Sequence, residues 1–248
     1  MLEAALRSGA AARRCVFEVF ARSLPGRRRY GVVAGLQRVL DLLPMFRFDD
    51  DALDFLVESK VVDAATREYL ADYAFTGSID AYAEGEVYVP GSPVLTVEGS
   101  FAECVVLETL ILSVFNHDSA VATAAARMVH AAGDRPCIEM GSRRTHEEAA
   151  VASARAAYIG GFASTSNLAA GRRWQIPTTG TAAHAFTLVH DDEPAAFAAQ
   201  VASLGPGTTL LVDTYDVSGG IRNAVAAAGT GLGAIRLDSG DLLTEARA

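Results

Sequence analysis

A histidine stands among small residues in the segment GTAAHAF, residues 180–186. It follows a glycine-threonine turn and is predicted to open a helix. Backbone N–H groups at a helix start attract phosphate, and a neutral imidazole nitrogen can act as a nucleophile or a base. The sequence leaves two interpretations of His184 open: a functional nucleophile or base, and a structural histidine.

Two adjacent arginines, Arg143 and Arg144, lie in the segment GSRRTHEEA, between a predicted strand and a predicted helix start. Guanidinium groups bind carboxylate and phosphate bidentately. At least one of the two is therefore predicted to bind an anionic group of a substrate. Thr145 and Glu148 have the spacing of a capping box, which would give them a purely structural role.

Carboxylates follow predicted strands in the motifs VDTYD, 212–216, and RLDSGD, 236–241. Such groups could hold ribose hydroxyls or Mg²⁺, or they could simply cap helices. Arg236 lies inside a predicted strand, where an unpaired charge would be costly, so it is predicted to need an anionic partner such as a substrate. The remaining candidate residues in these motifs are Asp213, Asp216, Asp238 and Ser239.

These motifs lie in a part of the chain where short strands and alanine-rich helices are predicted to alternate. The predicted strands are 137–140, 161–164, 175–178, 209–213 and 234–238, and the predicted helices are 145–158, 166–173, one or two up to about 203, and 219–228. Such alternation implies parallel strands with helices outside. Polar residues follow each strand, as at the mouth of a β/α barrel. A barrel needs about eight strands to close, so the prediction is an incomplete, irregular β/α barrel with part of the protein missing.

The first part of the chain has a mixed pattern. It predicts a helix near residue 1, a strand in which Phe17, Val19 and Ala21 alternate, helices at 34–42, 49–58 and 63–75, and a hairpin at 84–100. A long helix from Glu103 to about Ala132 follows, and Gly133 ends it. The predicted fold class is α/β, with residues 1–133 as a mixed α/β N-terminal domain with a long connecting helix and 134–248 as the first part of the barrel.

Composition limits the classes of function. A formal net charge of −9 argues against a nucleic-acid partner. The apolar run at 104–115 carries Glu108 and is too short to span a bilayer. No secretion signal and no CxxC pair are visible, so the expectation is a cytoplasmic protein with no membrane partner, disulfide frame or zinc site. Lys60 is the only lysine, which excludes a GxxxxGK[ST] phosphate loop.

Several longer segments, taken in order, resemble the nicotinate phosphoribosyltransferase family. They are FEVFARSLPGRRRYGVVAGL, LETLILSVFNHDSAVATAAARM, EMGSRRTHEEA, GGFASTSNLAA, GTAAHAF, LVDTYD and IRLDSGDL. The resemblance implies a type II phosphoribosyltransferase-like fold and a homodimer with shared active sites. It also implies ATP-coupled transfer of phosphoribosyl from 5-phosphoribosyl-1-diphosphate (PRPP) to nicotinate in NAD salvage, with ATP as co-substrate, Mg²⁺, and membership of the ATP-dependent ligase class.

The resemblance further implies roles for single residues. His184 would be phosphorylated transiently by ATP, and Thr181 and Arg236 would contact nicotinate. Arg143, and with it Arg144, would lie near the substrate carboxylate or phosphates. The residues expected to line the PRPP and Mg²⁺ region are Asp213, Asp216, Asp238 and Ser239, with no dedicated metal-ligand set.

The chain departs from the family pattern at both ends. Family members begin with a TDxYxLTM-like segment whose tyrosine stacks on the nicotinate ring, and they continue well beyond RLDSGDL. The expectation is therefore a fragment that carries part of the site, and its own activity is left open. Two alternatives remain: a related nicotinamide or quinolinate phosphoribosyltransferase, and a truncated, inactive remnant or partner subunit.

Overall fold

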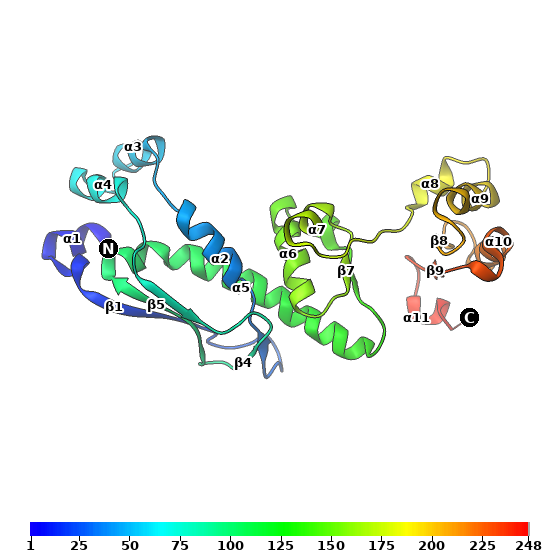
Figure 1. Ribbon diagram of the computed structural model, residues 1–248, viewed down its shortest axis with the longest axis horizontal. Coiled ribbons are helices and arrows are strands. Elements are labelled where there is room, and N and C mark those ends of the chain that lie inside the picture. Colours follow the sequence, from blue (N-terminus) through cyan, green and yellow to red (C-terminus); the bar gives the residue numbers. More distant parts are fainter. Residues whose placement is uncertain (248) are drawn as a thin grey trace. The chain divides into compact units, whose positions relative to one another are not determined.

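The computed structural model describes residues 1–247, which fall into two compact units: unit 1, Met1–Thr178, and unit 2, which begins at Thr179. Along the chain the units divide after residue 178, whereas the sequence predicted a domain division between residues 133 and 134. The reason is that α5 (Phe101–Ala132) packs along α6 (Glu147–Ile159), so the first βα segments belong to the same compact unit as the N-terminal sheet (Figure 1).

The main sheet of unit 1 has three antiparallel strands in the order β1-β5-β3, formed by Arg14–Phe20, Pro93–Ser100 and Ser78–Ala81. Alternate side chains of β1, including Phe17 and Val19, pack on the core, as the sequence pattern predicted. Helix α5 supplies the other side of this core with Leu107, Ile111 and Phe115.

The predicted hairpin at 84–100 is wrong. β4 (Val87–Tyr88) pairs with β2 (Gly31–Val32), whereas β5 pairs with β1 and β3. A Cβ atom at Gly31 would collide with the ring of Tyr88, so this pairing depends on a glycine far away in the sequence. The Pro-Gly turn in this segment correctly predicted two strands, but it did not predict which strands they pair with.

Short helices complete the first part of unit 1. They are α1 (Leu2–Ser8), a 3₁₀ turn (Ala10–Ala12), α2 (Leu36–Leu42), a 3₁₀ turn (Leu43–Met45), α3 (Asp50–Glu58) and α4 (Ala64–Ala71). The predicted helices at 34–42, 49–58 and 63–75 are confirmed, the last with an earlier end. Asp49 and Asp63 cap α3 and α4 by accepting from backbone N–H groups at 2.9 Å, which is why these helices begin where they do.

Helix α5 is much longer than its 12-residue apolar run at 104–115. By length and composition alone, with a mean hydropathy of 1.3 in its most apolar window, it could cross a membrane. The short apolar run alone did not predict this property, because the helix continues to Ala132. Burial of Leu107 and Ile111 against the sheet gives a structural reason for the apolar face of α5, since core helices share this composition.

The rest of unit 1 contains the first parallel pairing. β6 (Ile138–Glu139) pairs with β7 (Ser164–Thr165), and Thr178 joins β7 through a single parallel bridge. The predicted strand at 137–140 is confirmed, the one at 161–164 lies later, and the one at 175–178 is reduced to that bridge. Gln175 ends α7 (Leu168–Trp174) in a left-handed conformation, φ 56°, which leaves too little extended chain for a strand.

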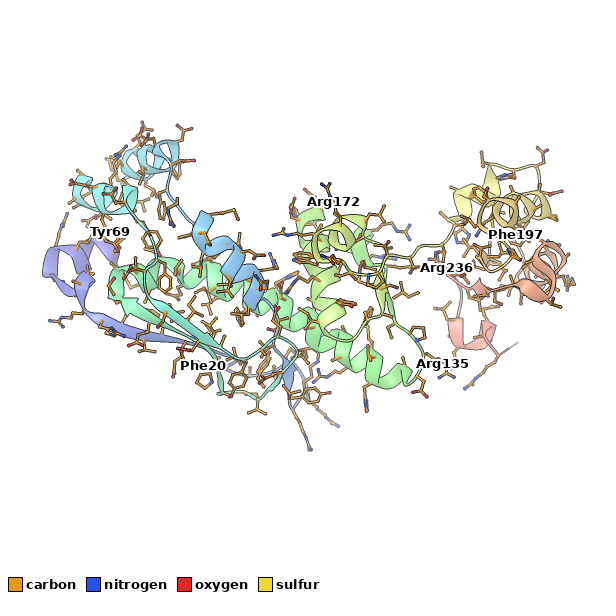
Figure 2. All side chains as sticks on the ribbon, viewed as in Figure 1. Phe20, Tyr69, Arg135, Arg172, Phe197 and Arg236 are labelled. Atoms are coloured by element: carbon orange, nitrogen blue, oxygen red, sulfur yellow. The ribbon has the colours of Figure 1, made fainter. Side chains whose placement is uncertain are left out.

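Unit 2 is built from a parallel strand pair and the helices on it. The elements are α8 (His184–Leu188), α9 (Glu193–Leu204), β8 (Thr209–Leu211), α10 (Val217–Ala228), a 3₁₀ turn (Gly229–Gly231), β9 (Ala234–Arg236) and α11 (Leu242–Glu245). Phe197, labelled in Figure 2, packs with Leu210, Val212 and Ala224 as its core. The predicted βα alternation, with two helices before residue 204, is confirmed.

Candidate functional site

Most of the predicted site residues of unit 2 gather where its two strands end. Asp213 comes after β8 and Asp238 comes after β9, so both lie at the C-terminal end of the parallel pair. Contacts between side chains, or between a side chain and an N–H group, connect six of the predicted residues: Thr181, His184, Asp213, Arg236, Asp238 and Ser239. Because parallel strands deliver their C-terminal ends to one edge, these side chains converge in unit 2 as the sequence predicted.

Asp213 is the buried centre of the cluster, with 2% of its side chain exposed. Its Oδ2 atom accepts from the hydroxyl of Ser239 and from the N–H of Asp238, both at 2.7 Å. Burial raises the pKa of Asp213, but these two hydrogen bonds and the nearby His184 outweigh burial and hold the pKa below its usual value. The other oxygen, Oδ1, accepts no hydrogen bond from the part of the chain that the structure describes.

The two ring nitrogens of His184 have different neighbours. Nδ1 lies 3.1 Å from the hydroxyl oxygen of Thr214. Nε2 lies 3.7 Å from Asp238 Oδ2 and 3.9 Å from Asp213 Oδ1, which is beyond hydrogen-bond range but close enough for electrostatic attraction. Two carboxylates beside Nε2 favour a hydrogen on that nitrogen, so Nδ1 is the nitrogen with the available lone pair.

Helix α8 begins at His184, as the sequence predicted. It has only five residues, so its aligned peptide dipoles are too few to form an anion site by themselves. Any reactivity of His184 must come from its ring and neighbours.

Arg236 is paired within the chain. It donates to the hydroxyl of Thr181 and, through a second nitrogen, to Asp238 at 2.7 Å. The expectation that a substrate must balance this charge is corrected, because Asp238 already does so. A guanidinium carries five N–H donors, so Arg236 keeps further donors for a ligand.

Asp216 is not part of the cluster. Its carboxylate caps α10 by accepting from the N–H of Gly219 at 2.6 Å. The helix-capping alternative that the sequence left open therefore describes Asp216.

Arg143 and Arg144 lie in unit 1, in a 3₁₀ turn, Gly141–Arg144, that begins one residue after the end of β6. Both are exposed, and neither makes a hydrogen bond or an ion pair with any residue between 1 and 247. The predicted capping box of Thr145 and Glu148 does not form, because α6 is capped by His146, whose Nδ1 accepts from the N–H of Glu148 at 3.3 Å.

Two further residues lie beside the predicted ones: Thr214, next to the His184 ring, and Glu139, beneath the turn that holds Arg143. Glu139 is one of the polar residues that the sequence places at strand ends. Thr214, which follows Asp213 beyond the end of β8, was missed, because a small hydroxyl group near a strand end is too common to be a signal by itself.

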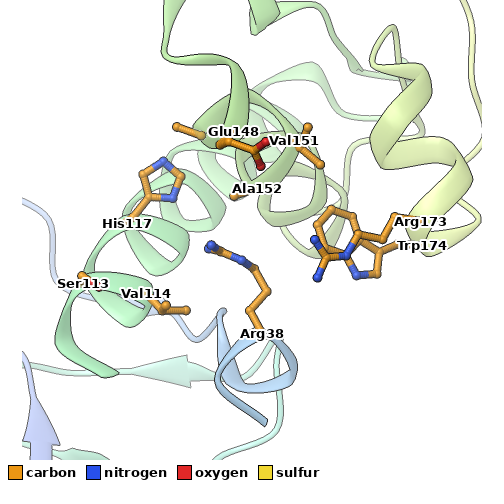
Figure 3. Close-up of a pocket in the computed structure, with 10 residues that line it drawn as sticks. Arg38, Ser113, Val114, His117, Glu148, Val151, Ala152, Arg173 and Trp174 are labelled. Atoms are coloured by element: carbon orange, nitrogen blue, oxygen red, sulfur yellow. The ribbon is translucent and has the colours of Figure 1, made fainter. Parts of the chain in front are cut away.

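Two hollows lie outside this cluster. One, of about 270 Å³ in unit 1, is shown in Figure 3, where Arg38 points in between His117 and Trp174. The Nη1 atom of Arg38 donates to Oδ1 of the buried Asp118 at 2.7 Å. The other, of about 320 Å³ in unit 2, is lined by helix-capping acids such as Asp192 and Asp216. Within residues 1–247, no group of three or more His, Cys, Asp or Glu side chains has a geometry suited to a metal ion.

Comparison with known proteins gives a consistent set of matches. A family model described as the nicotinate phosphoribosyltransferase (NAPRTase) N-terminal domain matches residues 1–116. The chain is 66% identical over 255 residues to nicotinate phosphoribosyltransferase pncB1 of Mycobacterium tuberculosis, covering 100% of this chain and 56% of that protein. It is 40% identical over 249 residues to the nicotinate phosphoribosyltransferase of Bacillus subtilis, covering 98% of this chain and 51% of that protein. The chain thus spans about half the length of these curated relatives.

Solved structures agree with the sequence matches. Human nicotinic acid phosphoribosyltransferase superposes with a TM-score of 0.87 at 29% identity, over 100% of this chain and 61% of that one. A nicotinate-nucleotide pyrophosphorylase from Pyrococcus furiosus gives a TM-score of 0.79 at 27% identity, over 97% and 55%. These matches confirm the predicted α/β fold class.

Proposed function

The chain belongs to the nicotinate phosphoribosyltransferase family, and on this premise we propose that it carries part of a site that transfers phosphoribosyl from PRPP to nicotinate. The products are nicotinate mononucleotide and pyrophosphate, as in NAD salvage. The observation that carries the proposal is the cluster of His184, Asp213, Arg236 and Asp238 at the ends of parallel strands β8 and β9.

In this proposal His184 takes a phosphoryl group from ATP. A lone pair on Nδ1 attacks the γ-phosphate, the bond to the ADP oxygen breaks, and ADP leaves. Asp213 and Asp238 beside Nε2 stabilise the positive charge that the ring gains when Nδ1 forms the new bond. Hydrolysis of the phosphohistidine then couples ATP to PRPP binding and turnover, which places the enzyme in the ATP-dependent ligase class.

Arg236 and Thr181 are proposed to bind nicotinate. The guanidinium is fixed by Thr181 and Asp238, so its remaining N–H donors have a set direction. A planar guanidinium matches the two oxygens of a carboxylate, which favours nicotinate over its uncharged amide.

The transfer step needs positioning and charge more than a protein base. The pyridine nitrogen attacks C1 of the ribose, and the bond from C1 to the pyrophosphate oxygen breaks. Arg143 and Arg144, exposed and without partners among the described residues, are proposed to bind anionic groups of the substrates.

The unpaired Oδ1 of Asp213, with Asp238, fits a Mg²⁺ ion, because carboxylate oxygens are ligands that Mg²⁺ prefers. Such an ion would supply charge neutralisation at the leaving pyrophosphate.

A cytoplasmic homodimer with shared active sites is proposed from the family resemblance, without a nucleic-acid or membrane partner. The net charge of −9 supports the absence of nucleic acid. Sedimentation of the natural protein tests the dimer, because a monomer with full activity would contradict shared sites.

A second candidate is a related pyridine phosphoribosyltransferase. The match to a nicotinate-nucleotide pyrophosphorylase with a TM-score of 0.79 keeps quinolinate in consideration, and nicotinamide is the third pyridine to compare. A third, non-catalytic candidate is an inactive remnant or a subunit that pairs with a longer copy.

The test is a competition assay with protein expressed from its complete natural coding sequence. Nicotinate, nicotinamide and quinolinate are supplied together with PRPP, with and without ATP. The consumption of each pyridine and the mononucleotides formed are both measured by chromatography, because transfer to quinolinate with loss of CO2 gives the same nicotinate mononucleotide as transfer to nicotinate. We expect nicotinate mononucleotide to dominate and ATP to raise its yield, with the ATP effect lost in His184→Ala and kept in His130→Ala, an exposed histidine on α5. Preference for quinolinate would favour the second candidate, and no product from any pyridine would favour the third.

A further inference from the structure

A buried carboxylate lies directly beneath the turn that carries Arg143. Glu139, the last residue of β6, is only 8% exposed. Its Oε2 atom accepts from the hydroxyl of Thr165 on β7 at 2.6 Å, and its Oε1 atom accepts from the N–H of Gly141. One side chain therefore joins the neighbouring strand to the start of the turn.

Asn167 makes a second connection between the same two segments. Its amide nitrogen donates to the hydroxyl of Ser142 at 3.1 Å, and its backbone N–H donates to the hydroxyl of Thr165 at 2.9 Å. Its side-chain oxygen caps α7 by accepting from the N–H of Ala170 at 2.9 Å. The Thr165 hydroxyl thus donates to Glu139 and accepts from Asn167, and the contacts form a closed ring, which we call the turn ring: Glu139, Gly141, Ser142, Thr165 and Asn167.

The turn ring compensates for short strands. β6 and β7 have two residues each, so their backbone ladder alone holds the strand ends weakly. Hydrogen bonds to a buried carboxylate are stronger than neutral ones. A Cβ atom at Gly141 would lie 2.9 Å from Glu139 Oε1, so a larger residue at this position would displace that carboxylate oxygen.

We propose that the turn ring positions Arg143 for an anionic group of the substrate, with Glu139 and Thr165 as positioning residues. The inference rests on the proposed function. Arg143 has no side-chain partner in residues 1–247, so its starting point and direction are set by the backbone of Gly141 and Ser142. Fixing that backbone before substrate binds reduces the ordering that binding must supply.

The first experiment tests the ring itself and needs no activity. Amide hydrogen exchange at Gly141 is measured by NMR or mass spectrometry in the wild-type protein and in Glu139→Ala. We expect exchange at Gly141 to be at least about tenfold faster in the variant, because its N–H loses a buried acceptor. Equal rates in the two proteins would overturn the turn ring.

The second experiment tests the positioning role by a double-mutant cycle. We expect Thr165→Val to lower kcat/KM for PRPP by about tenfold, mainly through KM, and Thr165→Ser, which keeps the hydroxyl, to stay within about twofold of wild type. In an Arg143→Ala background, Thr165→Val should have little further effect, because the two residues act on one interaction. Equal losses in both backgrounds would mean that Thr165 supports the fold and does not act through Arg143, which would overturn the proposal.

The two experiments separate the two claims. If the wild-type protein transfers phosphoribosyl to no pyridine, the proposed function fails and the positioning role fails with it, whereas the Gly141 exchange rate still decides whether the ring exists. If the wild-type protein is active and exchange at Gly141 is faster in Glu139→Ala, the proposed function and the turn ring both stand. In that case, equal losses from Thr165→Val in both backgrounds refute only the positioning role. Thermal unfolding of each variant shows whether a loss of kcat/KM comes from misfolding. If Thr165→Val does not fold, Thr165→Ser is compared with the wild-type protein instead.

Discussion

The hydroxyl oxygen of Thr214 lies 3.1 Å from Nδ1 of His184, whereas two carboxylates lie near the other ring nitrogen, Nε2. The imidazole therefore has a hydroxyl at one nitrogen and negative charge at the other. Because the hydrogen on the Thr214 oxygen can rotate, this contact can orient the ring and still release Nδ1 for reaction.

The Thr214 contact predicts an effect on phosphorylation of His184. Thr214→Val removes the hydroxyl but keeps the shape, so we expect phosphohistidine to form about tenfold more slowly from ATP. Acid-labile phosphate measured by ³¹P NMR checks this rate. Thr214→Ser keeps the hydroxyl and should behave like wild type, and equal rates in all three proteins would contradict a role for the contact.

The hydrogen bond from Ser239 to Asp213 predicts that Ser239→Ala loses stability in a pH-dependent way. In Ser239→Ala the carboxylate loses a hydrogen bond to its ionised form, so the pKa of Asp213 should rise toward its usual value. A lowered pKa stabilises the folded state above the unfolded pKa, about 4, and this contribution disappears as pH falls through the native pKa.

We therefore expect Ser239→Ala to lower the free energy of unfolding by about 1–2 kcal/mol at pH 7 and by less near pH 3. Denaturant unfolding at the two pH values measures both numbers. Ser218→Ala, at an exposed serine of α10, is the control. A loss that is the same at both pH values would show that Ser239 does not act through the charge of Asp213.

The geometry of Arg236 predicts that lysine cannot replace it. Arg236 contacts Thr181 and Asp238 through separate nitrogens, and a lysine ammonium cannot make this fork. We expect Arg236→Lys to raise KM for nicotinate about tenfold or more. Initial-rate kinetics give this value, with Arg222→Lys, at an exposed arginine of α10, as the matched control. Similar KM values for the two variants would rule out a fork-specific role.

The start of α5 predicts a second, independent acid effect, this time in unit 1. Ser100 and Glu103 form a capping box, and Glu103 also accepts from the N–H and hydroxyl of Thr76. Burial raises the pKa of Glu103, but the hydrogen bonds from Ser100 and Thr76 together lower it to about 2. The stabilisation by Glu103 should be complete above about pH 5 and should be lost between about pH 4 and pH 2.

Ser100→Ala should cost about 1 kcal/mol of stability at pH 7, and Glu103→Gln should weaken the loss of stability in acid. Hydrogen exchange in the first turn of α5, measured from pH 7 down to pH 3, checks both. Glu108→Gln, an exposed residue of the same helix, should leave the acid profile unchanged. An acid profile identical in Glu103→Gln and wild type would contradict the assigned role of Glu103.

The sequence was sufficient to predict the elements and the convergence of the candidate residues in unit 2. Strand periodicity placed Asp213 and Asp238 at the ends of neighbouring parallel strands, and the structure brings them to one edge. The pairing of β2 with β4 could not be predicted, because it depends on the fit of Tyr88 over Gly31, two residues far apart in the chain. The same holds for Arg236, whose partner Asp238 stands two residues away in a strand-end geometry that spacing alone does not define.

The yield of nicotinate mononucleotide from nicotinate and PRPP, with and without ATP, decides whether the protein performs the proposed transfer. The measurement uses the protein expressed from its complete natural coding sequence, and the product is quantified together with pyrophosphate. The proposed function predicts stoichiometric mononucleotide and pyrophosphate, a higher yield when ATP is present, and acid-labile phosphate on His184. Absence of nicotinate mononucleotide under both conditions, from a folded protein, would contradict it.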